Sequence, residues 1–326
     1  MKKLFFFVAF VAMSMLSMAQ VNQLVWANGR LLYGTPVESI DSLTYDEMQD
    51  VDTLHLLLPR TLVKVIHDTV YIHDTVYITV PGGDDTPATG IGTFSVSATK
   101  QVTFSPGNLQ YHPANNEWRF ALNQTDYVGD ANSNISATYN GWIDLFGWGT
   151  GNVPTKSSTD DSDYQTFVDW GTNQIGGDAP NTWRTLTFEE WRYLRNSRPN
   201  ANELCGVAQV NGVNGLVFLP DNWTCPEGIT FKSGFHSSYG VDYYAAYQTF
   251  TADQWAKLEA AGAIFLPAAG YRYGSDVRNV QYFGYYWSPT GLDSGIAGYL
   301  LFPSDEASVY GYALFYGLSV RLVKDL

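Results

Sequence analysis

Residues that could support catalysis are few and scattered in this chain. From residue 92 onward there are two histidines, His112 and His236, and a Ser or Cys nucleophile would need one of them as its general base. Neither lies in a recognisable catalytic motif. The sequence has no Gly-rich phosphate loop followed by Lys, no Gly-x-Ser-x-Gly turn and no His-Glu-x-x-His helix. We therefore expect a protein that is not an enzyme and that uses no cofactor.

Metal-binding patterns are incomplete as well. Residues 130–134 begin like a calcium loop, but Ile135 stands where the loop needs Gly, and no Glu occupies the twelfth position. Residues 160–163 form a second acidic cluster, which we interpret as a solvated loop. Cys205 and Cys225 lack nearby His residues that would complete a zinc shell. The sequence thus predicts no metal site.

The amino-terminal segment predicts export. Lys2 and Lys3 precede an apolar run over residues 4–16, and Ser17 and Ala19 supply the small residues of a cleavage site. The run has about 13 residues, fewer than the roughly 20 needed to span a bilayer. Residues 1–19 are therefore predicted to be a signal peptide for secretion across the inner membrane. The expected destination is extracellular or the cell surface, with the periplasm as an alternative.

The expected compartment decides whether the two cysteines can form a disulfide. An oxidising environment would allow Cys205 and Cys225 to pair as a disulfide. Two buried free thiols are the alternative that the sequence leaves open.

Charge narrows the choice of partners. The formal net charge is −14, which argues against nucleic acid and anionic membrane surfaces. No segment after the leader is apolar enough to cross a membrane. Aromatic residues make up 15% of the chain, and aromatic rings serve both as core and as contact surface.

Four segments follow the leader. Residues 20–60 contain two apolar runs that flank Asn28-Gly29, a pattern typical of a β-hairpin. Residues 61–80 carry the repeat IHDTVY at 66–71 and 72–77, whose even period and β-branched residues predict an extended β arm. Residues 81–91, rich in Pro, Gly and Asp, form a linker. Residues 92–326 form the main domain.

This domain is predicted to be α+β, with two short helices and short antiparallel strands. Thr187 with Glu190, and Thr251 with Gln254, have the spacing of capping boxes, each followed by a Trp and a Leu at helical spacing. Alternating residues predict strands at 93–97, 101–105 and 318–323. The rest reads as short strands and long loops.

The carboxy-terminal part is rich in aromatic residues and nearly uncharged. Residues 279–320 contain no Lys or Arg, and their acidic residues are Asp293, Asp305 and Glu306. Residues 310–316 (YGYALFY) follow neither the helical nor the strand period and lack the polarity of a loop. This pattern indicates an exposed recognition surface or a poorly patterned core.

Three blocks in this domain resemble a known family. FLPAAGYR at 265–272, GYYWSPT at 284–290 and GLSVRLV at 317–323 are similar to blocks of the "major paralogous domain" group of secreted bacterial proteins. That group is similar to the C-type lectin fold and to the formylglycine-generating-enzyme domain. The resemblance implies a C-type-lectin-like fold over residues 92–326. The cysteines that formylglycine-generating enzymes use near the carboxy terminus have no counterpart here.

Some members of this fold group are variable proteins of diversity-generating retroelements, which substitute adenine-containing codons in a carboxy-terminal window. The resemblance implies that Tyr286-Trp287-Ser288 and residues 319–323 are a constant framework around variable positions. The predicted variable residues, which lie between or next to these framework segments, are all of types that an Asn codon yields when its first two bases change. As the ligand-binding set we therefore predict Tyr285, Gly291, Leu292, Gly295, Ile296, Leu300, Val309, Tyr310, Tyr312, Ala313, Leu314, Phe315, Tyr316 and Leu318.

These observations predict a secreted or surface-displayed, adhesin-like protein that holds its ligand with an aromatic face. A protein ligand is favoured over a glycan, because Tyr side chains bury large areas at low entropic cost. Two alternatives remain open. One is a structural envelope or appendage subunit, and the other is an enzyme on the formylglycine-generating-enzyme-like scaffold. No motif indicates an oligomeric state.

Overall fold

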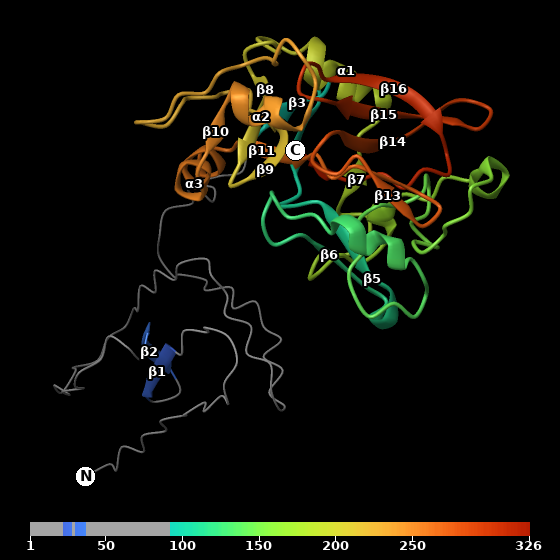
Figure 1. Ribbon diagram of the computed structural model, residues 1–326, viewed down its shortest axis with the longest axis horizontal. Coiled ribbons are helices and arrows are strands. Elements are labelled where there is room, and N and C mark those ends of the chain that lie inside the picture. Colours follow the sequence, from blue (N-terminus) through green and yellow to red (C-terminus); the bar gives the residue numbers. More distant parts are fainter. Residues whose placement is uncertain (1–21, 28–29, 37–91) are drawn as a thin grey trace. The chain divides into compact units, whose positions relative to one another are not determined.

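The computed structural model describes residues 22–27, 30–36 and 92–326 (Figure 1). The chain divides into two units, residues 1–79 and 80–326. In the first unit, β1 (Asn22–Ala27) and β2 (Arg30–Pro36) pair antiparallel with Ala27 opposite Arg30, so the predicted Asn28-Gly29 pair connects them. The predicted signal peptide, arm and linker lie outside the described residues, as does the conformation of the Asn28-Gly29 turn.

The first predicted helix is confirmed as α1 (Phe188–Asn196). The Thr187 hydroxyl accepts a hydrogen bond from the Glu190 amide at 3.2 Å, and the Glu190 carboxylate accepts one from the Thr187 amide at 2.9 Å. This reciprocal capping box satisfies two amides that the first turn of a helix leaves without partners. Trp191 and Leu194 are fully buried, as their spacing predicts.

The second predicted helix is α3 (Ala252–Ala260), which is also confirmed. Thr251 and Gln254 form its capping box at 2.9 and 3.2 Å. Just beyond its end, Gly262 adopts φ +92, a backbone conformation that a residue with a Cβ rarely takes.

Within the described residues a third α-helix, α2 (Val241–Tyr247), lies where the sequence predicted none. Its N-cap is Gly240, which makes no side-chain capping bond. Tertiary packing holds the helix instead, because the fully buried Tyr244 donates its hydroxyl to the Tyr282 and Phe302 carbonyls. The described chain also contains short 3-10 helices: η2 (Pro113–Asn115), η3 (Gly129–Asn134), η4 (Asp161–Tyr164) and η5 (Trp170–Thr172).

The strands of the second unit form several small sheets. Two have four strands, in the orders β3-β4-β17-β7 and β10-β8-β9-β11, and a third has the order β14-β15-β16. Two hairpins, β5-β6 and β12-β13, complete the set. The bounds are β3 (Phe94–Ser95), β4 (Gln101–Phe104), β5 (Leu109–His112), β6 (Glu117–Phe120), β7 (Arg184–Thr185), β8 (Cys205–Val210), β9 (Val213–Phe218), β10 (Thr249–Phe250), β11 (Ile264–Pro267), β12 (Tyr271–Tyr273), β13 (Asp276–Arg278), β14 (Gly284–Asp293), β15 (Ile296–Phe302), β16 (Ser308–Ala313) and β17 (Leu322–Asp325).

The last predicted strand is displaced along the chain. The prediction placed it at residues 318–323, but β17 covers Leu322–Asp325. The preceding residues make single bridges to three separate segments: Leu318 to Phe146, Ser319 to Tyr286 and Gly317 to Arg272. A buried segment can therefore have the alternating sequence of a strand although its backbone hydrogen bonds are made to several different segments.

The predicted α+β class is confirmed. In Figure 1, α1 lies beside the stacked strands β14, β15 and β16, and the β5–β6 hairpin lies below them. The first and last strands of the unit belong to one sheet, since β3 pairs with β4 and β4 pairs with β17. No helix in the described ranges is long and apolar enough to cross a bilayer.

We expect Thr187→Ala to lower the free energy of unfolding by about 1 kcal/mol, because it removes the hydroxyl that caps α1. Urea denaturation measures the change. Thr224→Ala, at an exposed position outside the helices, is the matched control and should stay within about 0.5 kcal/mol of the parent. Equal stability of the two variants would mean that the capping box adds nothing to the fold.

Candidate binding face on the β14–β16 sheet

The β14–β16 sheet has one face packed against α1. Leu300 and Phe302 of β15 belong to the same core cluster as Trp191 of α1. The sheet and α1 approach closely at Gly298, where an added Cβ would lie 2.4 Å from the Phe188 ring. Because alternate residues of a strand point to opposite faces, Tyr299 and its neighbours two positions away occupy the other face.

Burial on this second face decreases from β14 towards β16. Trp287 of β14 is opposite Tyr299 of β15, which in turn is opposite Tyr310 of β16. Trp287 is 0% exposed and Tyr299 5%, whereas Tyr310 is 39% and Tyr312 47% exposed. The edge strand β16 therefore presents two tyrosines to solvent, whereas Trp287 and Tyr299 on the neighbouring strands are buried.

The cover over the β14 end comes from distant segments. The Trp287 indole donates to the Phe146 carbonyl at 2.7 Å, and the Trp148 indole donates to the Ser288 carbonyl at 3.0 Å. Buried Leu314 and Leu318 pack into the same cluster as Trp287. These contacts fix the sheet on which the exposed tyrosines stand.

Five tyrosines form a closed circuit of ring contacts. Between ring centroids, Tyr299 lies 6.1 Å from Tyr312, Tyr312 4.5 Å from Tyr316, and Tyr316 5.3 Å from Tyr271. Tyr271 then lies 5.4 Å from Tyr285, and Tyr285 5.9 Å from Tyr299. The ring of Tyr310 contacts this circuit through Tyr299, with the two ring centroids 6.4 Å apart. We call these six residues the tyrosine cluster: Tyr271, Tyr285, Tyr299, Tyr310, Tyr312 and Tyr316.

Burial keeps the hydroxyl groups of three members of the cluster protonated at neutral pH. It raises the pKa of Tyr285 to about 12, and it also raises the pKa of Tyr299 and Tyr316. Tyr310 donates its hydroxyl to Glu306 at 3.0 Å. The cluster therefore offers both ring faces and hydroxyl groups, a combination suited to contacts with apolar and polar parts of a ligand.

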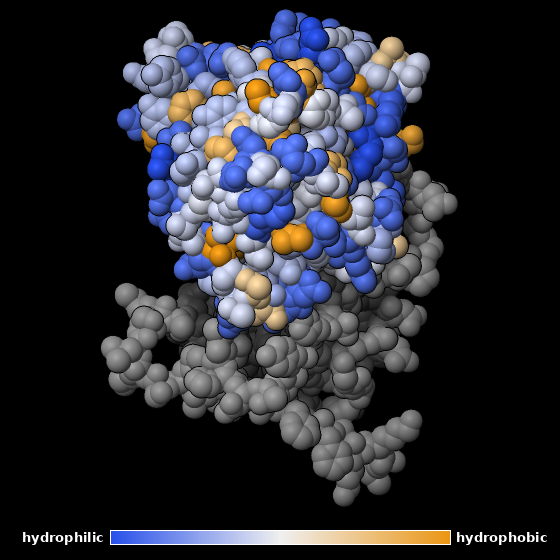
Figure 2. Space-filling view, turned by 90° about the vertical axis from the view of Figure 1, so that its right-hand side faces the viewer, coloured by the Kyte–Doolittle hydropathy of each residue, from blue (hydrophilic) through white to orange (hydrophobic). Residues whose placement is uncertain are grey.

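The side of the second unit at the right of Figure 1 is mixed in polarity. Figure 2, which views the side of the molecule at the right of Figure 1, shows hydrophobic atoms as scattered patches among hydrophilic and pale ones. Among the described residues, the exposed large apolar side chains on β14 and β15 are Leu292 and Ile296. Contact on this face would depend on tyrosine more than on aliphatic side chains.

Most of the predicted ligand-binding set is brought together on this sheet and the turn after it. Gly291, Leu292, Ile296, Tyr310 and Tyr312 are exposed. Partly buried members of the set are Tyr285, Gly295, Val309, Ala313, Phe315 and Tyr316.

Leu300, Leu314 and Leu318 are corrections to the predicted set. All three are buried, with exposed fractions of 3% or less, and cannot contact a ligand. Leu300 faces α1 because it alternates with Tyr299. Leu314 is turned inward where its amide donates to Asp161 at 2.7 Å, and Leu318 bridges to Phe146.

Tyr271 and Tyr273 are part of the face but were not predicted. They come from β12, where Arg272 between them is fully buried, so both rings lie on the outer side. Tyr273 contacts Phe315 at 5.5 Å and Tyr316 at 5.6 Å. The Tyr-x-Tyr alternation was visible in the sequence, but the pairing with residues more than 40 positions away was not.

The two cysteines do not form the disulfide that the sequence allowed. Both are free, with Cys205 buried and Cys225 exposed. The alternative of two buried thiols is therefore right for Cys205 alone. Burial raises the pKa of Cys205 to about 12, so it is a thiol at neutral pH.

Each of the two candidate catalytic histidines contacts residues near it in the chain or a neighbouring aromatic ring, and none of these contacts is with the other histidine. His112 is buried, accepts a bond from the Asn115 amide and packs its ring against Trp142. His236 stacks on Tyr243 at 4.4 Å and accepts from the Ser238 amide. Within the part of the chain that the structure describes, no group of three or more His, Cys, Asp or Glu side chains is placed to hold a metal ion.

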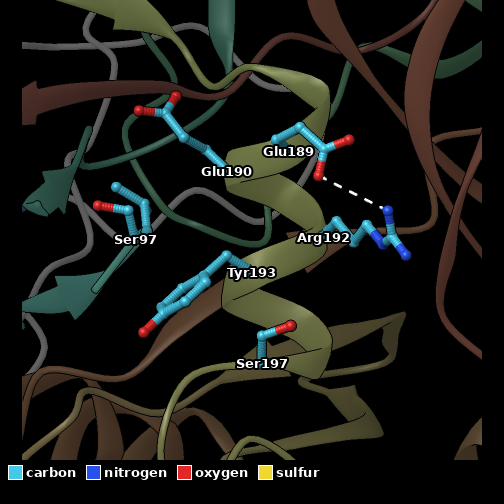
Figure 3. Close-up of a pocket in the computed structure, with 7 residues that line it drawn as sticks. Ser97, Glu189, Glu190, Arg192, Tyr193 and Ser197 are labelled. Carbon is cyan, nitrogen blue, oxygen red and sulfur yellow. Dashed lines mark ion pairs between the residues drawn. The ribbon is translucent and has the colours of Figure 1, made fainter. Parts of the chain in front are cut away.

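A pocket of about 310 Å³ lies on the surface of α1 (Figure 3). Glu190, Tyr193 and Ser97 lie on one side of the helix in this view, and Glu189 and Arg192 form an ion pair on the other. Glu190 already accepts from Arg184 at 2.7 Å. Because its carboxylates are engaged in ion pairs, the pocket is a weaker candidate for ligand binding than the tyrosine cluster.

Comparison with protein-family models, with curated proteins and with solved structures gives no match for this chain. The geometry of the tyrosine cluster therefore provides the main basis for a functional proposal.

Proposed function

We propose that this protein binds a protein ligand outside the cell through the tyrosine cluster of a C-type-lectin-like domain. The observation that carries the proposal is the exposure of Tyr310 and Tyr312 on a sheet whose other face is locked against α1. Rigid aromatic side chains lose little entropy on binding and bury large areas. Tyr310 and Tyr312 face solvent on a sheet that α1 holds in place, so they can bury area on binding with little loss of entropy.

The blocks that carry the family resemblance support the fold assignment. Residues 265–269 include all of β11 after its first position and are buried, Trp287 lies under the tyrosine cluster, and Ser319 to Val323 are buried. The resembling blocks are thus mostly framework, apart from Tyr271 and Tyr285 of the tyrosine cluster, and most of the intervening residues reach the surface. Export by a signal peptide at residues 1–19 completes the proposal.

The distribution of exposed positions also favours diversification by a retroelement. Eleven of the fourteen predicted variable residues are exposed or partly exposed, so most substitutions there would change the surface and leave the core intact. We expect the genome to contain an adenine-rich near-copy of the coding window for residues 282–323 beside a reverse transcriptase gene. A locus without such a copy would contradict the diversification and leave the binding proposal standing.

The binding proposal is tested by Tyr310→Ser combined with Tyr312→Ser. Surface plasmon resonance against panels of secreted proteins and of glycans compares the variant with the parent. We expect each ligand of the parent to bind the variant at least 10-fold more weakly, because hot-spot aromatic residues each contribute about 2 kcal/mol or more.

Tyr243→Ser is the matched control, since Tyr243 is 38% exposed and lies on α2. It should leave affinity within two-fold of the parent. Unchanged binding by the Tyr310/Tyr312 variant would show that the face is wrongly assigned. A parent that self-associates through this face and binds no panel member would favour a structural subunit instead.

A further inference from the structure

The sheet that carries the tyrosine cluster contributes only negative charge. Residues 279–320, which supply β14, β15 and β16, contain no Lys or Arg. Asp305 and Glu306 lie three and two residues before the start of β16 at Ser308. At the other end of the strand, Asp161 accepts a hydrogen bond from the Leu314 amide. Carboxylates therefore flank the exposed tyrosines at both ends of the strand.

The cations that lie beside the cluster are already engaged. Arg272 is fully buried and donates to the carbonyls of Leu145 and Lys156. Arg278 pairs with Asp276 at 3.0 Å, and Lys156 donates to the Asp163 carbonyl at 2.6 Å. An acidic ligand would thus meet carboxylates and no uncommitted cation among these groups, whereas a basic one would be attracted.

The backbone spacing of Tyr310 and Tyr312 matches the thickness of a flat cationic group. They stand two positions apart on one side of β16, a spacing of about 6.7 Å along a strand. That is about twice the contact distance of 3.5 Å between stacked planar groups. Tyr299 lies beneath the two of them, in ring contact with each.

Glu306 provides the matching charge. It accepts the Tyr310 hydroxyl at 3.0 Å, and a carboxylate can accept several hydrogen bonds at once. A guanidinium stacks on aromatic faces and forms two parallel hydrogen bonds with a carboxylate, which an ammonium group cannot do.

We propose that the protein partner presents an arginine to this face, with its guanidinium between Tyr310 and Tyr312, above Tyr299, and paired with Glu306. This inference rests on the function proposed above and adds the chemistry of the partner. The net charge of −14 favours the approach of such a basic surface over long distances.

The test begins with a phage-displayed library of random dodecapeptides selected on the purified full chain. Each recovered peptide is then measured against the Tyr310→Ser/Tyr312→Ser variant. Peptides that need the two tyrosines and are enriched in Arg support the inference. Peptides that need the tyrosines without Arg enrichment overturn it and leave the proposed function intact. A selection in which no peptide depends on the tyrosines overturns both.

Defined peptides provide the second measurement. Isothermal titration with hexa-arginine should give binding that weakens at least 10-fold with hexa-citrulline, which has nearly the same shape without the charge. Hexalysine should also bind at least 5-fold more weakly than hexa-arginine. Equal affinity for hexalysine, or for hexa-citrulline, contradicts a stacked and paired guanidinium.

Charge substitutions locate the contact. Glu306→Gln should weaken hexa-arginine binding by about three- to ten-fold. Glu227→Gln, at an exposed acidic position outside the sheet, removes the same charge and is the matched control. It should change affinity less than two-fold. Equal effects of the two variants would mean that overall charge, and not this face, attracts the peptide.

Discussion

Trp287→Ala is expected to lower the free energy of unfolding by about 3–5 kcal/mol, the range for deleting a fully buried Trp. Trp287 is 0% exposed and its indole donates to the Phe146 carbonyl at 2.7 Å. Its backbone carbonyl also accepts from the Trp191 indole at 3.4 Å, which links the sheet to α1. Removing the ring opens a cavity between the sheet and the segments that cover it.

Urea denaturation measures this loss, and Trp183→Ala is the control. Trp183 is partly buried, and its indole donates to Asp178 near the surface. Trp183→Ala should lower the free energy of unfolding clearly less than Trp287→Ala does. Trp287→Phe should recover part of the loss because it restores ring volume without the indole N–H. A loss below about 1 kcal/mol for Trp287→Ala would show that the sheet does not depend on this residue.

The free energy of unfolding is also expected to fall by about 2.4 kcal/mol between pH 4 and pH 7 because of Asp144. Burial raises the pKa of this carboxyl from 3.8 to about 6, and one pKa unit corresponds to about 1.4 kcal/mol. Well below pH 3.8 the group is protonated in both states. Between pH 4 and 6 the unfolded chain has lost the proton and the folded protein retains it, so stability decreases as pH rises.

The effect is isolated by subtracting the unfolding free energy of Asp144→Asn from that of the parent across pH 4–7.5. Asparagine must turn its NH2 group towards the Val128 amide or the Asn132 side chain, which both donate to Asp144 at 2.8 Å. The variant is therefore less stable overall, and the slope with pH is the readout. A difference that is flat with pH, or that rises, would mean that these hydrogen bonds keep the pKa of Asp144 low.

Local signals predicted the elements that depend on local contacts. The capping boxes at Thr187 and Thr251 fixed two helices because each box is made within four residues. Helix α2 has Gly240 at its N-cap and depends on the burial of Tyr244 by residues 38 or more positions away. Sequence periodicity carries no information on such contacts, so α2 was missed.

The residues proposed for binding were predicted only in part. The strand β16 (Ser308–Ala313) was missed, because residues 310–316 show no strand period, and Leu300, Leu314 and Leu318 of the predicted set are buried. The set was chosen by residue type, which does not show direction along a strand. Leu300 faces α1 because it alternates with Tyr299, and Leu314 and Leu318 follow β16 and pack into the buried cluster around Trp287. The contribution of Tyr271 required knowledge of how β12 packs, which the residues alone do not provide.

The alternation along β16 separates two roles within six residues. Val309 packs towards the helix side, and Tyr310 and Tyr312 point to the opposite side. Substitutions at the two tyrosines therefore change the exposed surface while the determinants of folding stay where they are. If the face binds as proposed, a lineage of such proteins could replace one partner with another by single steps, without first evolving a new scaffold.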